Sequence, residues 1–330
     1  MIQVFLASSI YILSGGFSWF FVKMHAGYNI PVEFSIVYRQ IIVCIIFFIV
    51  ALITKRRILL SFKELKLCLF VGIFYYSFYM LGAYYGSLFL ISGIVSFIGS
   101  MKIIFVEIIL SIYNKERPST RIFISAMFGS VGIYFLSVAN MKIEHLNRHM
   151  ILKGILLAMI SPIGNAISNV TLELSNRKKN IDNVVMISYC SLVGSVIVLA
   201  IGMLRHKQII LPPFEFKYLL GLSYLSCISS GLAVLCVYFL ISKIGSLKTT
   251  YMSLSHAPLA ILLAVIFQGY RLNLNTIIGI IFCCYSLYIG MRYQARKGKY
   301  QKHRQMVNSR RNRKKIVKYI ESKLKIVTSI

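Results

Sequence analysis

The charged side chains of one long apolar stretch are the first candidates for chemistry. Between Lys66 and Lys115 the only charged residues are Lys102 and Glu107. An ionised group is costly to place in so much apolar sequence, so its presence favours a functional role. The Lys102 ammonium could bind a substrate carboxylate or phosphate, but backbone carbonyls or Glu107 could equally satisfy it. The two residues are five apart, or about 140° around a helix, which is unfavourable for a direct pair.

Arg39, His256 and Pro258 also carry polar or helix-breaking side chains in apolar surroundings, and Glu107 has possible roles of its own. Arg39 has a rigid donor fork suited to bridging helices, so a structural role is favoured over a binding role. Glu107 could bind a proton or cation, or reach the polar end of its helix. His256 lies two residues before Pro258, which frees a backbone carbonyl. This pair could form the wall of a site, although a packed, hydrogen-bonded histidine is the preferred interpretation.

A polar helix face and an aromatic group complete the candidate substrate-binding residues. Asn165 and Asn169 are spaced to share one face of a helix, which either lines a cavity or joins helices by hydrogen bonds. Trp19 and the group containing Tyr76 and Tyr79 could shape a cavity for a flat or amphipathic ligand. Packing and interfacial belts explain most aromatic residues without a function.

Catalytic and cofactor signatures do not occur in the sequence. We find no phosphate-binding loop, no HExxH motif and no acidic metal cluster. The seven cysteines lie in apolar stretches without a CxxC pair, so neither a disulfide framework nor a metal site is expected. We therefore predict no catalytic residues, no metal and no cofactor, and ATP-driven transport is disfavoured.

The elements that position these residues are membrane-spanning helices. The chain is 58% hydrophobic and only 14% charged, with a mean hydropathy of +0.75. A soluble fold needs a wet exterior that this composition cannot supply. A span needs about 20 apolar residues. The sequence predicts ten: 2–22, 32–54, 66–86, 90–113, 120–139, 152–172, 183–204, 218–241, 247–268 and 274–291. The third and fourth are separated by an uncharged turn between Tyr85 and Gly93 that should be buried or interfacial.

Lysine and arginine counts predict the orientation. Ten spans place both termini on one side. With that side cytoplasmic, the inner loops carry 13 basic residues, the outer loops carry 8, and the segment from Arg292 adds 14 more to the inside. The positive-inside rule therefore predicts both termini in the cytoplasm, and a plasma membrane (the inner membrane of a bacterium) is expected. The net charge of +28 follows from the same bias, so no nucleic acid partner is expected.

The two halves of the chain look alike. Residues 1–140 and 150–291 each hold five predicted spans, so the second half must enter the bilayer from the opposite side. Inverted repeats of this kind recur in secondary transporters, with the binding site between the halves. We expect an all-α integral membrane fold of two inverted five-helix repeats, followed by a basic cytoplasmic tail at 292–330.

Residues 1–292 resemble the drug/metabolite transporter superfamily in its ten-helix EamA-type branch. Gly15-Gly16-Phe17-Ser18-Trp19 followed by Lys23 resembles the first-helix motif, with Gly15 where the family has Trp. The second helix matches with Pro31 and Arg39, the sixth with Asn169-Val170 and the ninth with Pro258. The fourth helix has no matching Pro. The resemblance implies a permease that exposes a central site alternately to either side.

The predicted function is thus a secondary transporter of a small organic metabolite. The alternatives are a membrane enzyme or lipid-handling protein, and a non-transporting scaffold with a basic recruiting tail. The expected partners are a small-molecule substrate, the lipid bilayer and anionic lipid headgroups at the tail. The oligomeric state is left open.

The tail has two parts. Residues 292–315 carry eleven basic residues with almost no apolar clustering, which predicts disorder. Ile316, Ile320, Leu324 and Val327 then recur at helical spacing between lysines, which is typical of an amphipathic helix on an anionic surface. A solvated charge run that only enforces topology is the alternative.

Overall fold

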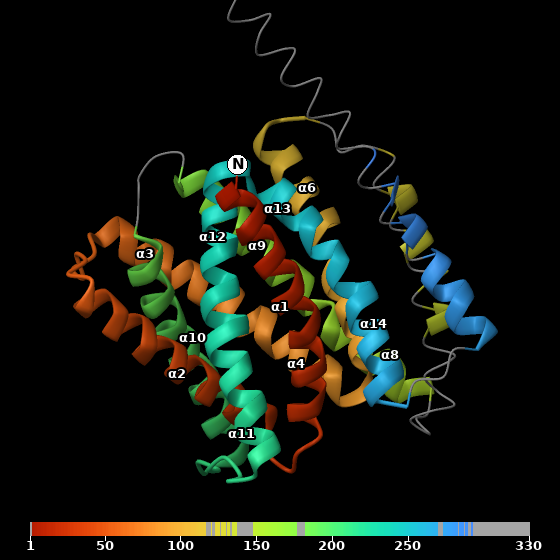
Figure 1. Cartoon of the computed structure of the whole chain (residues 1–330), viewed down its shortest axis with the longest axis horizontal. Helices are drawn as coiled ribbons and strands as arrows, with labels where there is room; N and C mark the ends of the chain where they lie inside the picture. The colour runs from red at the N-terminus through yellow and green to blue at the C-terminus, as the bar shows by residue number, and fades with distance from the viewer. Residues whose placement is uncertain are drawn as a thin grey trace, which may run out of the picture.

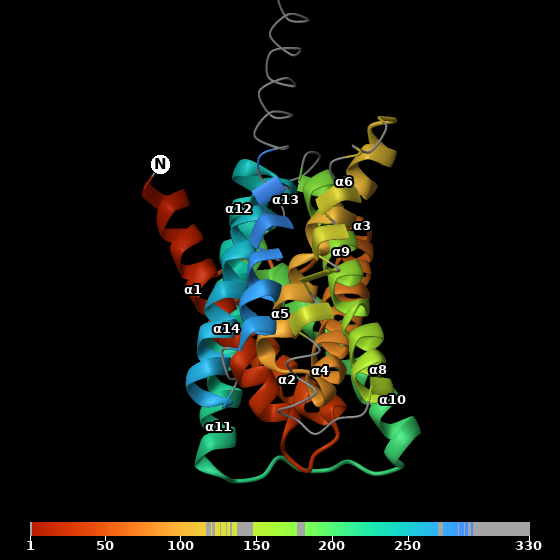
Figure 2. The same ribbon diagram turned by 90° about the vertical axis from the view of Figure 1, so that its right-hand side faces the viewer.

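The computed structural model consists of helices and the segments that connect them in the part of the chain it describes. These residues are 2–116, 120, 123–125, 127–129, 131–132, 134–136, 148–176, 182–269, 273–282, 284–286, 288–289 and 292, and none of them lies in a strand. The helices run mostly along one axis, with the N-terminus at one end of the bundle and the connection between α10 and α11 at the other (Figure 2). The chain is therefore an all-helical protein, as the sequence predicts.

The described helices follow one another along the chain in the order that the colours show (Figure 1). They are α1 (Ile2–Ala26), α2 (Val32–Ile53), α3 (Phe62–Val71), η1 (Gly72–Tyr79), α4 (Met80–Phe89), α5 (Ser92–Ser100), α6 (Lys102–Tyr113), α8 (Arg148–Ala158), α9 (Ile160–Asn176), α10 (Asn183–His206), α11 (Phe216–Ser223), η2 (Tyr224–Leu232), α12 (Ala233–Ile244), α13 (Ser246–Met252), η3 (Ser253–Ser255) and α14 (His256–Phe267).

Seven helical stretches in this part of the chain are long and apolar enough to cross a membrane. They are Ile2–Ala26, Val32–Ile53, Phe62–Phe89, Ser92–Tyr113, Arg148–Ser175, Asn183–His206 and Phe216–Ile244. Two shorter apolar helices, Phe123–Leu136 and Leu274–Ser286, accompany them. Each lies at a predicted span, as does the interrupted stretch from α13 to α14. The total of ten spans remains a prediction.

The outer surface of the bundle is apolar, as contact with lipid requires. Val196 on α10 and Ile266 on α14 are each 59% exposed, and many other large apolar side chains are also exposed. In water such a surface would drive association, whereas hydrocarbon solvates it.

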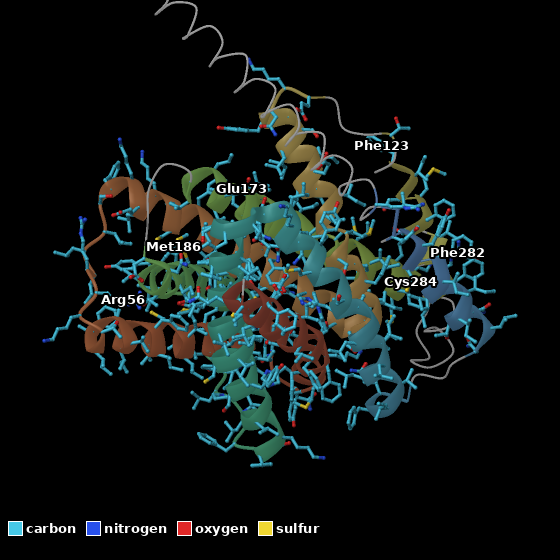
Figure 3. All side chains as sticks on the ribbon, turned by 45° about the horizontal axis from the view of Figure 1, so that its top comes forward. Arg56, Phe123, Glu173, Met186, Phe282 and Cys284 are labelled. Carbon is cyan, nitrogen blue, oxygen red and sulfur yellow. The ribbon has the colours of Figure 1, made fainter. Side chains whose placement is uncertain are left out.

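Arg56 lies at one edge of the bundle, and Phe123, Phe282 and Cys284 lie at the opposite edge (Figure 3). The protein is a multi-span membrane protein.

The predicted turn between the third and fourth spans is tight and buried. α4 ends at Phe89 and α5 begins at Ser92, so only Leu90 and Ile91 connect them. These two residues are 0% and 1% exposed. The Ser92 hydroxyl donates to the Gln268 side-chain oxygen at 3.0 Å, which anchors the turn against the end of α14. Its interior position explains why the turn has no charged residue.

Four helical irregularities come in two pairs. The third stretch contains the π-helical segment η1, and the stretch Phe216–Ile244 contains the π-helical segment η2. The stretch Ser92–Tyr113 is interrupted at Met101, and the stretch ending in α14 is interrupted by the 3-10 turn η3. π-Bulges and 3-10 turns within helices often occur at functional sites. All four lie near the middle of their stretches.

α10 packs closely along α2 and η1 because glycine allows the approach. A Cβ on Gly194 would lie 2.3 Å from the Cβ of Tyr76. At the same residue, the Gln40 side chain on α2 donates to the backbone carbonyl of Tyr76. This hydrogen bond satisfies a carbonyl within the π-helical segment. Small residues let helix backbones approach in the same way throughout membrane proteins.

Three predictions concern residues or side chains that the structure does not describe. The tail from 293 onward, with its disordered part and its amphipathic helix, is not described, nor is the boundary between the two repeats at 137–147. The side chain of Pro258 is also not described, although its backbone forms part of α14. These predictions therefore stay as they are.

Candidate functional site

A central cavity lies between helices from both halves of the chain. It holds about 540 Å³ of space free of atoms, its opening included. Its lining residues are Tyr11, Gly15, Ser18, Trp19, Arg39, Tyr75, Tyr79, Ser96, Gly99, Ser100, Lys102, Asn165, Ser229, Ala233, Val234, Val237, Ser253 and His256. Small-molecule sites typically have this mixture of aromatic, apolar and polar groups.

The helical irregularities supply much of the lining. Lys102 is the first residue of α6 and directly follows the interruption at Met101, while Ser253 begins η3. Tyr75 and Tyr79 belong to η1, and Ser229 belongs to η2. Each irregular segment therefore contributes to the cavity or adjoins a residue that does. A regular helix would present these positions at different angles.

Lys102 is bound at one side of the cavity by α1. Lys102 is 7% exposed, and its Nζ donates to the Tyr11 hydroxyl at 3.2 Å. Nζ also lies 6.0 Å from the centre of the Tyr11 ring, at the limit of a cation–π contact. The tyrosine therefore solvates the ammonium group without neutralising it.

Arg39 is bound from the opposite half of the sequence. Nε donates to the Ser230 hydroxyl at 2.6 Å, and Nη2 donates to the Ser229 hydroxyl at 3.0 Å. The residue is 3% exposed and also lines the cavity. These two hydrogen bonds bridge α2 and η2, as a structural role for Arg39 predicts. Because Arg39 also lines the cavity, its remaining N–H groups are available to a ligand.

His256 explains the departure at Gly15. Its Nε2 is 3.1 Å from the Tyr11 carbonyl oxygen, and its ring meets the Tyr11 ring edge-on with centroids 4.8 Å apart. A Cβ on Gly15 would lie 2.1 Å from Cε1 of the histidine. Position 15 therefore has no room for the family's tryptophan while His256 fills that space. The histidine is both packed and part of the cavity lining.

An aromatic wall faces the cations. The rings of Trp19 and Tyr79 meet edge-on at 6.5 Å, and Tyr79 stacks on Tyr75 at 4.9 Å. Trp19 packs over Gly99, where a Cβ would lie 2.8 Å from the indole. Asn165 adds a side-chain amide whose oxygen accepts from Asn169 at 2.8 Å. Aromatic faces, one amide, His256 and several serine hydroxyls thus make up the rest of the lining besides the two cations and small apolar residues.

Three predicted site residues lie outside the cavity. Tyr76 is fully buried in the core against α10, because adjacent helix positions point in different directions. Asn169 supports Asn165 from one turn further along α9 without lining the cavity. Glu107 in α6 is 1% exposed and is also absent from the lining. Its carboxylate accepts a hydrogen bond from the Ser111 hydroxyl at 3.4 Å.

Sequence reasoning missed two important parts of the site. Tyr11, which contacts both Lys102 and His256, has no charge and lies 91 residues before the lysine, so no local pattern indicates it. Ser229 belongs to a run of small residues in η2 that resembles ordinary helix packing. Within the described residues, no group of three or more His, Cys, Asp or Glu could hold a metal ion.

The fold and cavity define a class of multi-span membrane proteins with a central cavity lined by polar and aromatic side chains. Residues 152–291 match the model of the EamA-like transporter family, which confirms the resemblance to that family over the second half of the chain. A comparison with curated proteins finds no match.

A comparison with solved structures finds several that share the fold of this chain. One of them, titled "Crystal structure of protein", is similar with a TM-score of 0.62 and 12% sequence identity. The similarity covers 90% of this chain and 99% of that one. At this identity the comparison shows the fold alone. It extends the structural likeness beyond the residues matched by the family model.

Proposed function

We propose that the protein is a secondary transporter that moves a small organic metabolite across the membrane by alternating access to the central cavity. The observation that carries the proposal is the position of the cavity. Lys102 lies in the middle of the stretch Ser92–Tyr113, and Tyr11 and Asn165 occupy the middle parts of their own stretches. A polar cavity at this depth supports a role in passage across the bilayer.

Two inverted repeats supply the mechanism in this proposal. Tyr224, where η2 begins, lies 152 residues after Gly72, where η1 begins. Ser253, where η3 begins, lies 152 residues after the interruption at Met101. The same shift relating both kinds of irregularity supports a repeat with boundaries at 1–140 and 150–291. Rocking of one repeat against the other around a fixed site would expose the cavity to each side in turn.

Uptake by the purified full-length chain in liposomes tests the proposal. Vesicles with and without protein are incubated with a defined metabolite mixture, and their contents are measured by mass spectrometry. Accumulation or exchange of at least one solute above the empty vesicles is expected. Ala233→Phe, which places a ring in the cavity lining, should reduce it, whereas the exposed substitution Lys63→Met should not. If no solute moves with a correctly folded protein, a membrane enzyme or a scaffold becomes the better hypothesis.

The orientation is proposed with both termini in the cytoplasm of a plasma membrane, on the basis of the lysine and arginine distribution. Ser61, between α2 and α3, would then face the cytoplasm. A cysteine placed there should resist a membrane-impermeant thiol reagent in intact cells and react after permeabilisation, with the parent chain as control. Labelling in intact cells would reverse the orientation.

A further inference from the structure

The cavity has two cations and no anion among the residues that line it. Lys102 and Arg39 are the charged lining residues, and neither Asp nor Glu is among them. In the described part of the chain, no carboxylate lies within ion-pair distance of either cation. Buried charges in a membrane protein are ordinarily paired, because an unpaired one forfeits its hydration. This cavity is therefore electrostatically incomplete.

Both cations also keep donors in reserve. An ammonium group has three N–H donors, and Lys102 uses one of them, on Tyr11. A guanidinium has five, and Arg39 uses one on Ser229 and one on Ser230. The Tyr11 and Ser229 hydroxyls accept from these cations, so their own hydrogens remain able to donate into the cavity. The arrangement offers donors from several directions, and no carboxylate lines the cavity beside them.

The remaining wall suits an organic body. Trp19, Tyr75 and Tyr79 line the cavity with aromatic surface, and Val234 and Val237 add aliphatic surface. A hydrated inorganic ion gains little from such a wall, while a carbon skeleton gains by its removal from water. The lining thus combines a cationic end with an apolar side.

We propose that the cargo of this cavity is a small organic anion whose carboxylate or phosphate is held by Lys102 and Arg39 while its carbon skeleton packs against Trp19 and Tyr79. The assignment rests on the proposed transport function and names its substrate class. The bound anion completes the charge balance that the protein leaves open. An anion with both negative charge and apolar surface would use the whole lining.

The chain contains its own reporter for this charge. Trp19 is the sole tryptophan of the sequence and lines the cavity. Its fluorescence can be quenched by iodide (an anion), caesium (a cation) and acrylamide (neutral) in the purified full-length protein at constant ionic strength. A cationic cavity concentrates iodide and repels caesium. Iodide should therefore quench Trp19 more efficiently than caesium.

Matched variants separate the cavity from the rest of this basic protein. Lys102→Met should lower the iodide quenching constant by about twofold or more, since one unit charge near the indole changes the local anion concentration by that order. Acrylamide quenching should stay constant, which shows that access is unchanged. Lys102→Arg should retain the iodide preference. Lys63→Met removes the same charge from an exposed position outside the cavity and should leave the iodide constant unchanged.

Competition tests the organic part. Benzoate should reduce iodide quenching and raise the unfolding temperature, whereas benzamide, which has the same ring but no charge, should do neither. Protection by inorganic phosphate alone would overturn the organic part. Equal quenching by iodide and caesium, or an iodide constant unaffected by Lys102→Met, would overturn the anionic class. These results are independent of transport: vesicles that move only neutral or cationic solutes contradict this inference, and vesicles that move nothing contradict the proposed function.

Discussion

Two buried charged regions of the molecule satisfy their charges in opposite ways. In the central cavity, Lys102 and Arg39 meet only hydroxyl groups. At the end of the bundle away from the N-terminus, the Glu33 carboxylate is 1% exposed, and Nη1 of Arg205, whose side chain is 54% exposed, reaches it at 2.9 Å. Tyr85 also donates to that carboxylate, and His206 Nε2 lies 3.6 Å from it.

The difference separates a structural charge cluster from an open binding site. The Glu33 cluster joins α2, α4 and α10 and contains both signs of charge, so it stabilises the packing without a ligand. The cavity lining contains one sign of charge, which is the basis for the proposal that a bound anion completes it. A buried charge with a protein partner indicates architecture, and a buried charge without one indicates a ligand. Substitutions in each region test whether this distinction holds.

The largest effect is expected from Lys102→Met. Transport of an organic anion identified in liposomes should fall by at least about tenfold, since a lost charged hydrogen bond in a desolvated site is worth about 1.5–3 kcal/mol. The ligand-free variant should nevertheless be more stable, because an unpaired buried cation disfavours folding. Uptake rates and thermal unfolding of the purified protein measure the two quantities. A variant that loses stability along with transport would show that Lys102 is structural.

Glu33→Gln should have the opposite profile. It leaves Arg205 and Tyr85 without their carboxylate and should cost about 1–3 kcal/mol of stability, with little effect on iodide quenching at Trp19. Thermal unfolding of Glu33→Gln, Arg205→Met and the double variant gives the coupling between the two residues. Single and double variants that are equally unstable would support the structural role. Purely additive effects would show that the pair contributes nothing as a unit.

The sequence predicts the elements better than it predicts this distinction. Apolar segments of about 20 residues and a turn without charges are local properties, so the spans and the Leu90–Ile91 turn could be predicted. Lys102, Trp19, Asn165 and His256 also line the cavity, because polar or bulky groups in apolar helices tend to face inward. Their neighbours depend on contacts between distant segments. Glu33 appears in the sequence as an acid in the first turn of a helix, and its partner is 172 residues away.

The π-helical segments could not be predicted either. They change which side chains of η1 and η2 face inward without leaving a mark in the apolar pattern. Tyr75, Tyr76 and Tyr79 are alike in type, yet two line the cavity and Tyr76 lies in the core. Residue type therefore identified the aromatic group, while the helix geometry determined which of its tyrosines line the cavity.

Gly194→Ala is expected to have an intermediate effect, because it tests the packing that holds the two regions together. α10 carries Arg205 at its end and packs through Gly194 against Tyr76. A methyl group there must displace the tyrosine or the helix, which should cost about 1–3 kcal/mol. Gly202→Ala on the same helix is the control, since its nearest neighbour would be 3.3 Å away. Equal unfolding temperatures for the two variants would contradict the close contact.

The smallest effect is expected at the exposed pair Arg56–Asp182, a third kind of charged region. The Nη1–Oδ2 distance is 2.6 Å, but the side chains are 39% and 32% exposed, so water screens the pair. Asp182 has a second role, because its Oδ1 accepts from the Val184 amide at 2.9 Å and caps α10. Arg56→Gln removes only the ion pair and should cost about 0.5 kcal/mol or less.

Two substitutions at one position separate the pair from the cap. Asp182→Asn keeps a good capping group and should resemble Arg56→Gln, whereas Asp182→Ala loses the cap as well and should cost about 1 kcal/mol more. Thermal unfolding of the three variants measures these differences. If Asp182→Asn proves as damaging as Asp182→Ala, the charge rather than the cap supplies the stability. An exposed ion pair would then matter here, and the contrast between exposed, paired and unpaired charges would have to be redrawn.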